Sequence, residues 1–236
     1  MGAYKRVLLK LSGEQLAGKY DAGIDAELAT WLAKEIAQVV ASETQVVIMV
    51  GGGNYARGAQ LAGHGIGRVT ADNVGMLATM MNALALADVF NNVGVAARAL
   101  TNIKADQVAD QFTHRRAVSD LRKGRVVIVA GGIGRPYLTT DTAAVSLALE
   151  LDCEAVLKAT KVDGVYDKDP AKFADAVKID HMSFDEAVSN GAIKVMDKAA
   201  LGLAMEHTLP TIVFNPLTEK NILRAAAGEP VGTKIG

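Results

Sequence analysis

The sequence predicts an α/β fold in which helices cover both faces of a mostly parallel β-sheet. Short runs rich in β-branched residues alternate along the chain with longer segments of helical period, which is typical of such a sheet. Glycine-containing stretches follow three of the strand-like runs, at residues 12–14, 51–54 and 130–136. Because ligands bind beyond the carboxyl ends of the strands in these folds, we expect the three loops to converge on a site for phosphate groups.

The expected elements follow in order along the chain. Asp25 is the expected N-cap of the first long helix, whose apolar residues repeat at helical spacing. Ser183 and Glu186 predict a capping box ahead of a later helix. The main elements are strands at Arg6–Leu11, Gln45–Val50, Arg125–Ala130, Glu154–Ala159 and Pro210–Asn215, and a long helix from about Ala71 to Val93.

Sulfur-containing side chains are expected in the core. Met76, Met80 and Met81 lie on the long helix, where packing is a more frequent role for methionine than ligand binding. Cys153 is the single cysteine, so it makes no intramolecular disulfide, and its apolar neighbours favour a buried, unreactive thiol. This cysteine usage fits a reducing cytoplasm.

Composition indicates one domain that binds neither nucleic acid nor a membrane. The chain has 236 residues, of which 50% are hydrophobic, enough for one sizeable core over residues 1–236. Its 25 lysines and arginines against 26 acids give no field that would attract nucleic acid or an anionic membrane. Lys10 interrupts the first apolar run, which argues against a signal peptide, and we expect no apolar run of bilayer length.

Two nucleotide-binding patterns are nearly matched. Gly13–Lys19 follows the P-loop spacing, but Tyr20 stands where a metal-binding hydroxyl is needed, and the next helix is expected only near Asp25. The stretch GGIGRPY lacks the last glycine of a dinucleotide fingerprint, because Tyr137 occupies that position, and Pro136 argues against a helix beginning there. A P-loop enzyme is therefore not expected, and a Rossmann dehydrogenase is a weak alternative.

Lys10 is the better candidate for phosphate binding. A lysine inside an apolar strand is costly unless it is paired or faces a ligand. Lys10 ends the first strand immediately before Ser12 and Gly13, so its ammonium group would lie beside the N–H groups of a tight turn.

Six segments follow in order over nearly the whole chain: LLKLSGE at Leu8–Glu14, GGGNYARG at Gly51–Gly58, RVTADNVGMLATMMNALAL at Arg68–Leu86, PYLTTDTAA at Pro136–Ala144, LKATKVDGVYDKDP at Leu157–Pro170 and KVMDKAA at Lys194–Ala200. Together they closely resemble bacterial UMP kinases of the amino-acid kinase superfamily. The resemblance implies a three-layer sandwich of the amino-acid kinase-like (carbamate kinase-like) fold. It also implies that the N-terminal half binds the phosphoryl acceptor, that the C-terminal half binds ATP, and that the activity is transfer of the γ-phosphoryl group of ATP to UMP in pyrimidine biosynthesis.

The resemblance assigns Lys10 and Asp141 to catalysis. Lys10 would neutralise the transition state, and Asp141 would hold Lys10 or the metal in position, although it could also be the N-cap of its helix. The second pKa of a phosphate monoester is about 6, so UMP needs no general base. Mg²⁺ is expected to arrive with ATP. The implied ATP-binding residues are Lys10, Leu11, Ser12, Gly13, Gly53, Arg57, Thr160, Tyr166 and Asp169.

The implied acceptor site combines the second glycine loop, the long helix and the third glycine loop. Asp72 matches a residue on the ribose of UMP, but near a helix N-terminus it could equally serve as a cap. The implied UMP-binding residues are Gly52, Asp72, Ile133, Gly134, Arg135, Pro136, Tyr137, Leu138, Thr139 and Thr140. This chain has Ile133 and Arg135 where the bacterial enzymes commonly read GTGNP, so the resemblance carries over only backbone contacts at these two positions.

Assembly and regulation follow from the resemblance alone. Bacterial members are typically hexamers that GTP activates and UTP inhibits, which implies a homohexamer with these effectors. Arg98 and Arg125 match positions associated with GTP, whereas Ala87 and Asn91 replace polar residues of some relatives. Two other functions stay open: a sibling kinase that phosphorylates a carboxylate or carbamate, and a non-enzymatic nucleotide-binding protein on the same fold.

Overall fold

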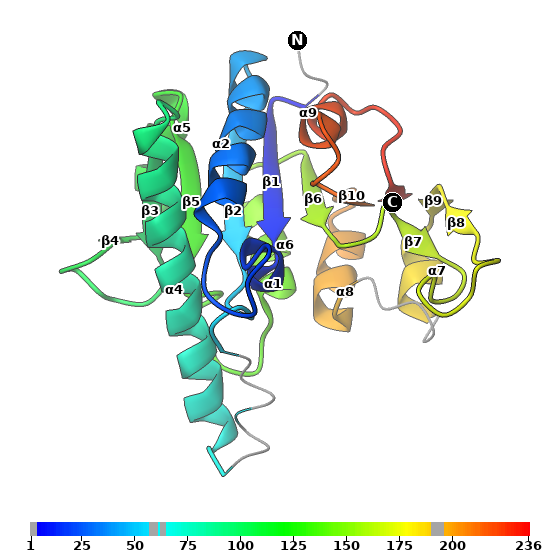
Figure 1. Cartoon of the computed structure of the whole chain (residues 1–236), viewed down its shortest axis with the longest axis horizontal. Coiled ribbons are helices and arrows are strands. Elements are labelled where there is room, and N and C mark those ends of the chain that lie inside the picture. Colours follow the sequence, from blue (N-terminus) through cyan, green and yellow to red (C-terminus); the bar gives the residue numbers. More distant parts are fainter. Residues whose placement is uncertain (1–3, 57–60, 62–64, 190–195) are drawn as a thin grey trace.

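One large sheet forms the centre of the molecule. The computed structural model describes residues 4–56, 61, 65–189 and 196–236 (Figure 1). Nine of the strands in these residues form a sheet in the order β4-β3-β5-β2-β1-β6-β10-β11-β9, and β7 and β8 form a separate hairpin. In the large sheet only the β10–β11 pair is antiparallel. The predicted mostly parallel sheet is confirmed.

The bounds of the elements are as follows. The strands are β1 (Arg6–Leu11), β2 (Gln45–Val50), β3 (Ala97–Thr101), β4 (Asp110–Gln111), β5 (Val126–Ala130), β6 (Ala155–Ala159), β7 (Val165–Tyr166), β8 (Lys178–Ile179), β9 (His181–Met182), β10 (Thr211–Phe214) and β11 (Thr233–Ile235). The helices are α1 (Gly13–Leu16), α2 (Ala26–Ala41), α4 (Arg68–Asn92), α5 (His114–Arg122), α6 (Thr140–Glu150), α7 (Phe184–Ser189), α8 (Lys198–Glu206) and α9 (Asn221–Ala226).

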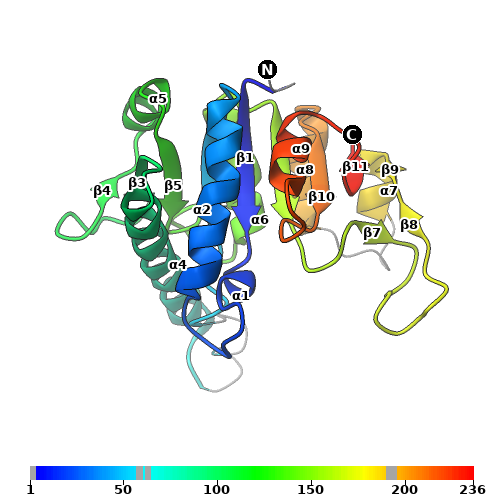
Figure 2. The ribbon, with the colours of Figure 1, turned by 45° about the horizontal axis from the view of Figure 1, so that its top comes forward.

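Helices cover both faces of the sheet and bury a separate apolar layer on each (Figure 2). Successive residues of a strand point to opposite faces. In β1, Leu9 therefore joins the layer under α2, α4 and α9, whereas Leu8 joins the layer under α5, α6 and α8. Strands buried on both sides read as continuous apolar runs, which is why the sequence located them within a residue.

Caps at the helix ends agree with the sequence in two predicted cases. The Asp25 carboxylate accepts hydrogen bonds from the backbone N–H groups of Glu27 and Leu28 and so caps α2. Ser183 and Glu186 exchange hydrogen bonds ahead of α7, which confirms the capping box.

The long helix α4 differs from three expectations of the sequence analysis. It begins at Arg68 with Gly67 as the N-cap, so Asp72 lies in the second turn and caps nothing. Only Met80 of the three methionines is buried; Met81 is exposed, and Met76 borders a cavity. Contrary to expectation, α4 is also long and apolar enough to span a membrane by length and composition, but half of its most apolar stretch is buried, as in the core helix of a globular protein.

A buried amide pair fastens α4 to the loop after β2. Asn82 of α4 is fully buried, and its Nδ2 donates to the carbonyl oxygen of Gly51 at 2.7 Å. Asn82 and Asn54 also donate to each other's Oδ1 atoms at 2.7 and 2.9 Å. Because an unpaired polar group inside the protein is costly, these bonds fix the glycine loop against the helix.

We expect Asn82→Ala to lower the free energy of unfolding by about 1–3 kcal/mol, because the Gly51 carbonyl and the Asn54 amide lose their buried partner. Asn73→Ala is a matched control on the same helix, where the side chain is exposed, and its expected effect is within about 0.5 kcal/mol. Denaturant unfolding of both variants measures the difference. Equal effects would mean that the buried amide pair adds nothing to stability.

Candidate active site

Two buried lysines lie side by side at the carboxyl end of the sheet. Lys10 of β1 and Lys158 of β6 are paired in register on adjacent parallel strands. Each is only 9% exposed. Strand alternation places both on the face of Leu8 and Val156, which is the face that α6 covers. The sheet therefore directs two ammonium groups toward the first turn of α6.

Asp141, in that first turn, lies between the two lysines. Its Oδ2 accepts a hydrogen bond from the Nζ of Lys158 at 2.5 Å. Its Oδ1 is 2.8 Å from the Nζ of Lys10, as an ion pair without hydrogen-bond geometry. Thr139, not Asp141, caps the helix, so the alternative of Asp141 as an N-cap is wrong. We call these three residues the Lys10–Asp141–Lys158 cluster.

The cluster carries more positive than negative charge. Burial by itself would raise the pKa of the Asp141 carboxyl, but the charges of Lys10 and Lys158 outweigh burial and hold this pKa below its usual value. Burial lowers the pKa of the Lys158 ammonium group, and the neighbouring Asp141 opposes this decrease. One carboxylate between two ammonium groups leaves an excess positive charge, which an anionic ligand can neutralise.

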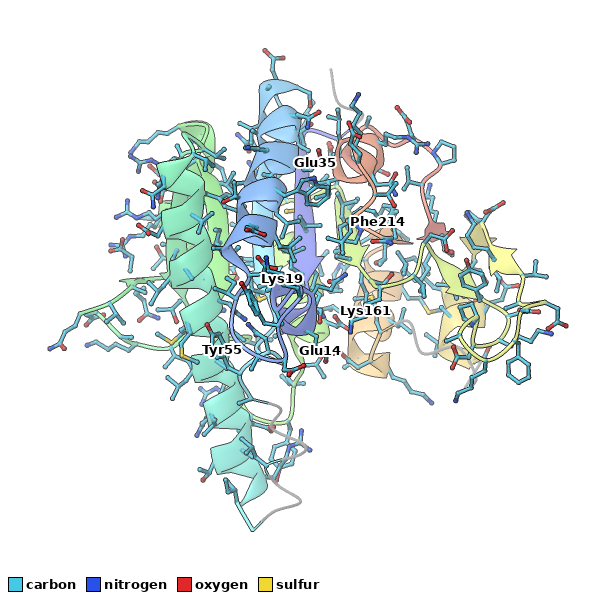
Figure 3. All side chains as sticks on the ribbon, in the orientation of Figure 1. Glu14, Lys19, Glu35, Tyr55, Lys161 and Phe214 are labelled. Carbon is cyan, nitrogen blue, oxygen red and sulfur yellow. The ribbon has the colours of Figure 1, made fainter. Side chains whose placement is uncertain are left out.

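The glycine loops after β1 and β2 touch each other beside this cluster. The backbone N–H of Gly51 donates to the carbonyl of Leu11 at 2.9 Å. A Cβ atom on Gly13 would lie 2.5 Å from the backbone nitrogen of Gly53, and one on Gly52 would lie 2.7 Å from the carbonyl oxygen of Gly75 in α4. Only glycine permits this backbone packing. In Figure 3, Glu14, Tyr55 and Lys161 lie at this same end of the sheet.

A cavity of about 150 Å³ opens between the second glycine loop, α4 and the loop after β5. Five predicted acceptor-site residues line it: Gly52, Asp72, Arg135, Leu138 and Thr140. Gly75, Met76, Thr79 and Gly132 line it as well. Thr140 directly precedes Asp141 in the sequence, so the cavity ends near the Lys10–Asp141–Lys158 cluster. The structure therefore places this cavity next to the surplus positive charge.

The other predicted acceptor residues have different surroundings. The hydroxyl of Thr139 donates to Asp197, the N-cap of α8, and Ile133 borders a neighbouring cavity. Gly134 has a φ of +73° and packs against Asn102. Tyr137 is exposed and contacts α4, and Pro136 precedes it in the same loop.

The predicted ATP-binding residues fall into two groups. Ser12, Gly13 and Gly53 belong to the touching glycine loops, and Leu11 is buried in the core. Arg57 lies outside the described residues. The second group follows β6. Its members are Thr160, whose hydroxyl donates to the carbonyl of Val162, Tyr166 in β7, and Asp169, whose Oδ1 accepts from the backbone of Ala171.

Lys19, which completes the near-match to a P-loop, plays no part in this site. Its ammonium group is exposed and pairs with Glu27 at 2.7 Å. The structure places a one-turn helix, α1, directly after Ser12, where the sequence predicted only a tight turn.

Sequence reasoning missed two residues of the site, Lys158 and Asp197. Lys158 carries the same signal as Lys10, a lysine inside an apolar strand, and could have been found by the same argument. Asp197 accepts hydrogen bonds from the hydroxyls of Thr139 and Thr142 and from the backbone of Ala200. Its position in the KVMD motif was visible in the sequence, but its link to the start of α6 was not.

The described residues include no group of three or more His, Cys, Asp or Glu side chains that could hold a metal ion. Both carboxylate oxygens of Asp141 face ammonium groups. A magnesium ion commonly takes one or two carboxylates together with substrate phosphates and water. The side chains in the described residues therefore fit a magnesium ion that arrives bound to a nucleotide. They do not form a separate cage of protein ligands for it.

Comparisons with known proteins identify the family of the chain. Residues 5–215 match the amino acid kinase family. The structure of UMP kinase from Bacillus anthracis superposes with a TM-score of 0.92 at 39% identity, covering 99% of this chain and 96% of that one. UMP kinase from Ureaplasma parvum gives 0.90 at 32% identity, with 98% of each chain covered. Uridylate kinase from Archaeoglobus fulgidus gives 0.74 at 31% identity, with 98% and 99% covered.

The family match extends from the start of β1 to the end of β10 and so includes both lysines and Asp141. The similar structures superpose on nearly the full length of this chain. Fold, site and comparisons lead to one conclusion: the chain belongs to the amino acid kinase family.

Proposed function

We propose that this protein is a UMP kinase, which transfers the γ-phosphoryl group of ATP to UMP and produces ADP and UDP. The observation that carries the proposal is the Lys10–Asp141–Lys158 cluster at the end of the cavity that Asp72 and Thr140 line. Three similar structures of UMP or uridylate kinases, each at least 31% identical, support the choice of acceptor.

The cluster suits phosphoryl transfer because the reaction brings two polyanions together. The ammonium groups of Lys10 and Lys158 can neutralise the charge that spreads over the transferred group in the transition state. Asp141 fixes both ammonium groups in advance, so little reorganisation is needed during the reaction. Asp141 is held ionised by the two lysines, so it acts as a positioning group and not as a proton acceptor.

The acceptor needs no general base from the protein. A phosphate monoester has its second pKa near about 6, so UMP is mostly a dianion at neutral pH and its oxygen is already nucleophilic. The acceptor phosphate would lie at the Thr140 end of the cavity, next to the cluster, with the ribose near Asp72. The Oδ2 of Asp72 accepts two hydrogen bonds from the protein, and no described residue donates to its Oδ1. This oxygen could accept a hydrogen bond from a ribose hydroxyl.

ATP would occupy the side of the cluster formed by the first two glycine loops and the segment after β6. The backbone N–H groups of the loops at Gly13 and Gly53 can donate to phosphate oxygens. Thr160, Tyr166 and Asp169 then belong to the region of the adenine nucleotide. Mg²⁺, bound with ATP, supplies neutralisation of the β- and γ-phosphates. In this arrangement the C-terminal half of the domain holds the adenine nucleoside, whereas the N-terminal half supplies the glycine loops for the ATP phosphates and contributes Gly52 and Asp72 to the acceptor site.

A homohexamer regulated by GTP and UTP is part of the same proposal, together with a cytoplasmic location in pyrimidine biosynthesis. Leu77 and Met81 form an exposed apolar strip on α4 that a second subunit could cover. Arg98 and Arg125 both contact the Oδ1 of Asp120, at 3.7 and 2.8 Å. A guanine nucleotide would therefore compete with a carboxylate for these arginines.

We expect ADP formation in the presence of ATP and Mg²⁺ to be fastest with UMP as the acceptor. The decisive assay compares UMP, CMP, acetylglutamate and carbamate at equal concentrations. Faster turnover of acetylglutamate or carbamate would assign the protein to a sibling kinase. Binding of ATP without turnover of any acceptor would favour a non-enzymatic role.

Replacement of either lysine of the cluster is expected to reduce kcat strongly without unfolding the protein. We expect Lys10→Met and Lys158→Met each to lower turnover by at least about a hundredfold, or roughly 3 kcal/mol, because the contact gains most of its strength in the transition state. In each variant Asp141 keeps one ammonium partner. Lys34→Met, at an exposed position of α2, is the control and should keep full activity. Near-normal turnover of Lys158→Met would make that lysine purely structural.

Asp72→Asn is expected to raise KM for UMP about tenfold and to narrow the preference for UMP over dUMP, with little change in KM for ATP. The asparagine oxygen can still accept from the backbone of Tyr137, but its amide group then faces the ribose hydroxyl, and one mismatched polar contact costs about 1–3 kcal/mol. Steady-state kinetics with both acceptors measure this. An unchanged UMP/dUMP ratio in a variant that melts early would exclude the ribose contact.

A further inference from the structure

Three residues at the rim of the acceptor cavity form a connected set of contacts. The Nε of Arg68 lies 2.8 Å from the Oδ2 of Asp72, one turn further along α4. The backbone N–H of Tyr137 donates to the same oxygen at 2.8 Å. The guanidinium carbon of Arg68 also lies 4.8 Å from the centre of the Tyr137 ring, a distance at which a cation and an aromatic face attract each other. We call these three residues the Arg68–Asp72–Tyr137 clasp.

The clasp joins the two walls of the acceptor cavity. One wall is α4, which contributes Asp72, Gly75 and Met76, and the other is the loop after β5, which contributes Arg135 and Leu138. In Figure 1 this loop descends from β5 toward the lower half of α4. The two walls are far apart in the sequence, so contacts between them decide how wide the cavity is.

The conformation of Tyr137 points to a specific role. The backbone φ of Tyr137 is +69°, a left-handed conformation that residues other than glycine and asparagine rarely adopt. This conformation turns the N–H toward Asp72 while the ring lies beside Arg68, outside the set of residues that line the cavity. Tyr137, which was predicted to bind the acceptor, is 64% exposed, and its ring lies against the guanidinium group of Arg68.

We infer that Arg68 and Tyr137 are positioning residues for the acceptor. They act through Asp72: two donors hold its Oδ2, which leaves Oδ1 as the carboxylate oxygen available to the cavity. They also hold the loop that carries Arg135 and Leu138 against α4. The inference rests on the proposed function, because it gives the clasp a role in binding the acceptor. It assigns no part of the chemical step to either residue, since the Lys10–Asp141–Lys158 cluster lies on other elements.

The test separates acceptor binding from chemistry. Loss of one exposed cation–ring contact should weaken acceptor binding about two- to fivefold. We therefore expect Tyr137→Leu to raise KM for UMP by this factor, with kcat and KM for ATP unchanged. Tyr137→Phe keeps the ring and should behave as the wild type. Arg68→Gln removes both the ion pair and the ring contact, so its KM for UMP should rise about tenfold.

A double variant tests whether the two side chains act together. Arg68→Gln/Tyr137→Leu should be no worse than Arg68→Gln, because the ring contact is already lost in the single variant. Tyr20→Leu is the matched control: Tyr20 is also exposed and lies near a cation, with the Nζ of Lys19 5.6 Å from its ring centre, but it is not among the residues that line the cavity. Its KM for UMP should not change.

The outcomes that would overturn the inference are distinct. Additive effects in the double variant would mean that Arg68 and Tyr137 act independently. Equal losses in Tyr137→Phe and Tyr137→Leu would assign the effect to the hydroxyl, and equal changes in KM for UMP and for ATP would indicate a general structural role.

A measurement without any substrate separates the clasp from the proposed function. In the acceptor-free protein, hydrogen exchange at the Tyr137 amide should be slower in the wild type than in Arg68→Gln, because the arginine helps to hold Asp72 in place. Equal exchange would overturn the clasp whatever the acceptor is. If the wild type fails to phosphorylate UMP while the exchange rates differ, the proposed function fails and the clasp as a contact stands.

Discussion

The ion pairing of one carboxylate with two buried ammonium groups is the constraint on which the rest of the site depends. Removing three charges from water is costly, and the cost is offset only when each charge lies against an opposite one. Asp141 provides this for both Lys10 and Lys158. The balance is incomplete, because two positive charges face one negative charge. An anionic group bound beside the cluster would complete the balance of charge.

The backbone determines where these charges lie. Lys10 and Lys158 are neighbours because β1 and β6 are adjacent, parallel and in register. The position of Asp141 depends on where α6 begins. There the hydroxyl oxygen of Thr139 accepts hydrogen bonds from the backbone N–H groups of Asp141 and Thr142. The same hydroxyl donates a hydrogen bond to Asp197. Asp197 in turn caps α8. The N-termini of two helices are therefore tied together beside the cluster.

Helix α4 organises the neighbouring cavity in a comparable way. Asn82 holds the glycine loop after β2, and the hydroxyl of Thr79 accepts the backbone N–H of Gly131 at 2.7 Å in the loop after β5. Both polar groups are buried, so these links are dry and directional. Nearer the N-terminus of α4, at the solvent-exposed rim, the contacts to the loop after β5 come from Arg68 and Asp72. The inner part of the cavity is thus held by buried bonds, and the outer part by exposed ones that water can replace more easily.

The sequence by itself determined the fold class, five strands of the large sheet and two of the three residues of the charged cluster. Strand alternation, apolar runs and caps such as Asp25 are local patterns, so β1, β2 and the start of α2 were placed correctly. The choice of Lys10 followed from the cost of a lysine in an apolar strand, and that of Asp141 from resemblance. Only the tertiary structure showed that Lys158 lies beside Lys10 and that Asp141 is their shared ion-pair partner and not a helix cap. Only the tertiary structure showed that Asp72 and Tyr137 belong to one clasp. These features depend on strand register and helix packing between segments distant in the sequence. Such contacts are stabilised by residues far apart along the chain, so they produce no local periodic pattern that the sequence could reveal.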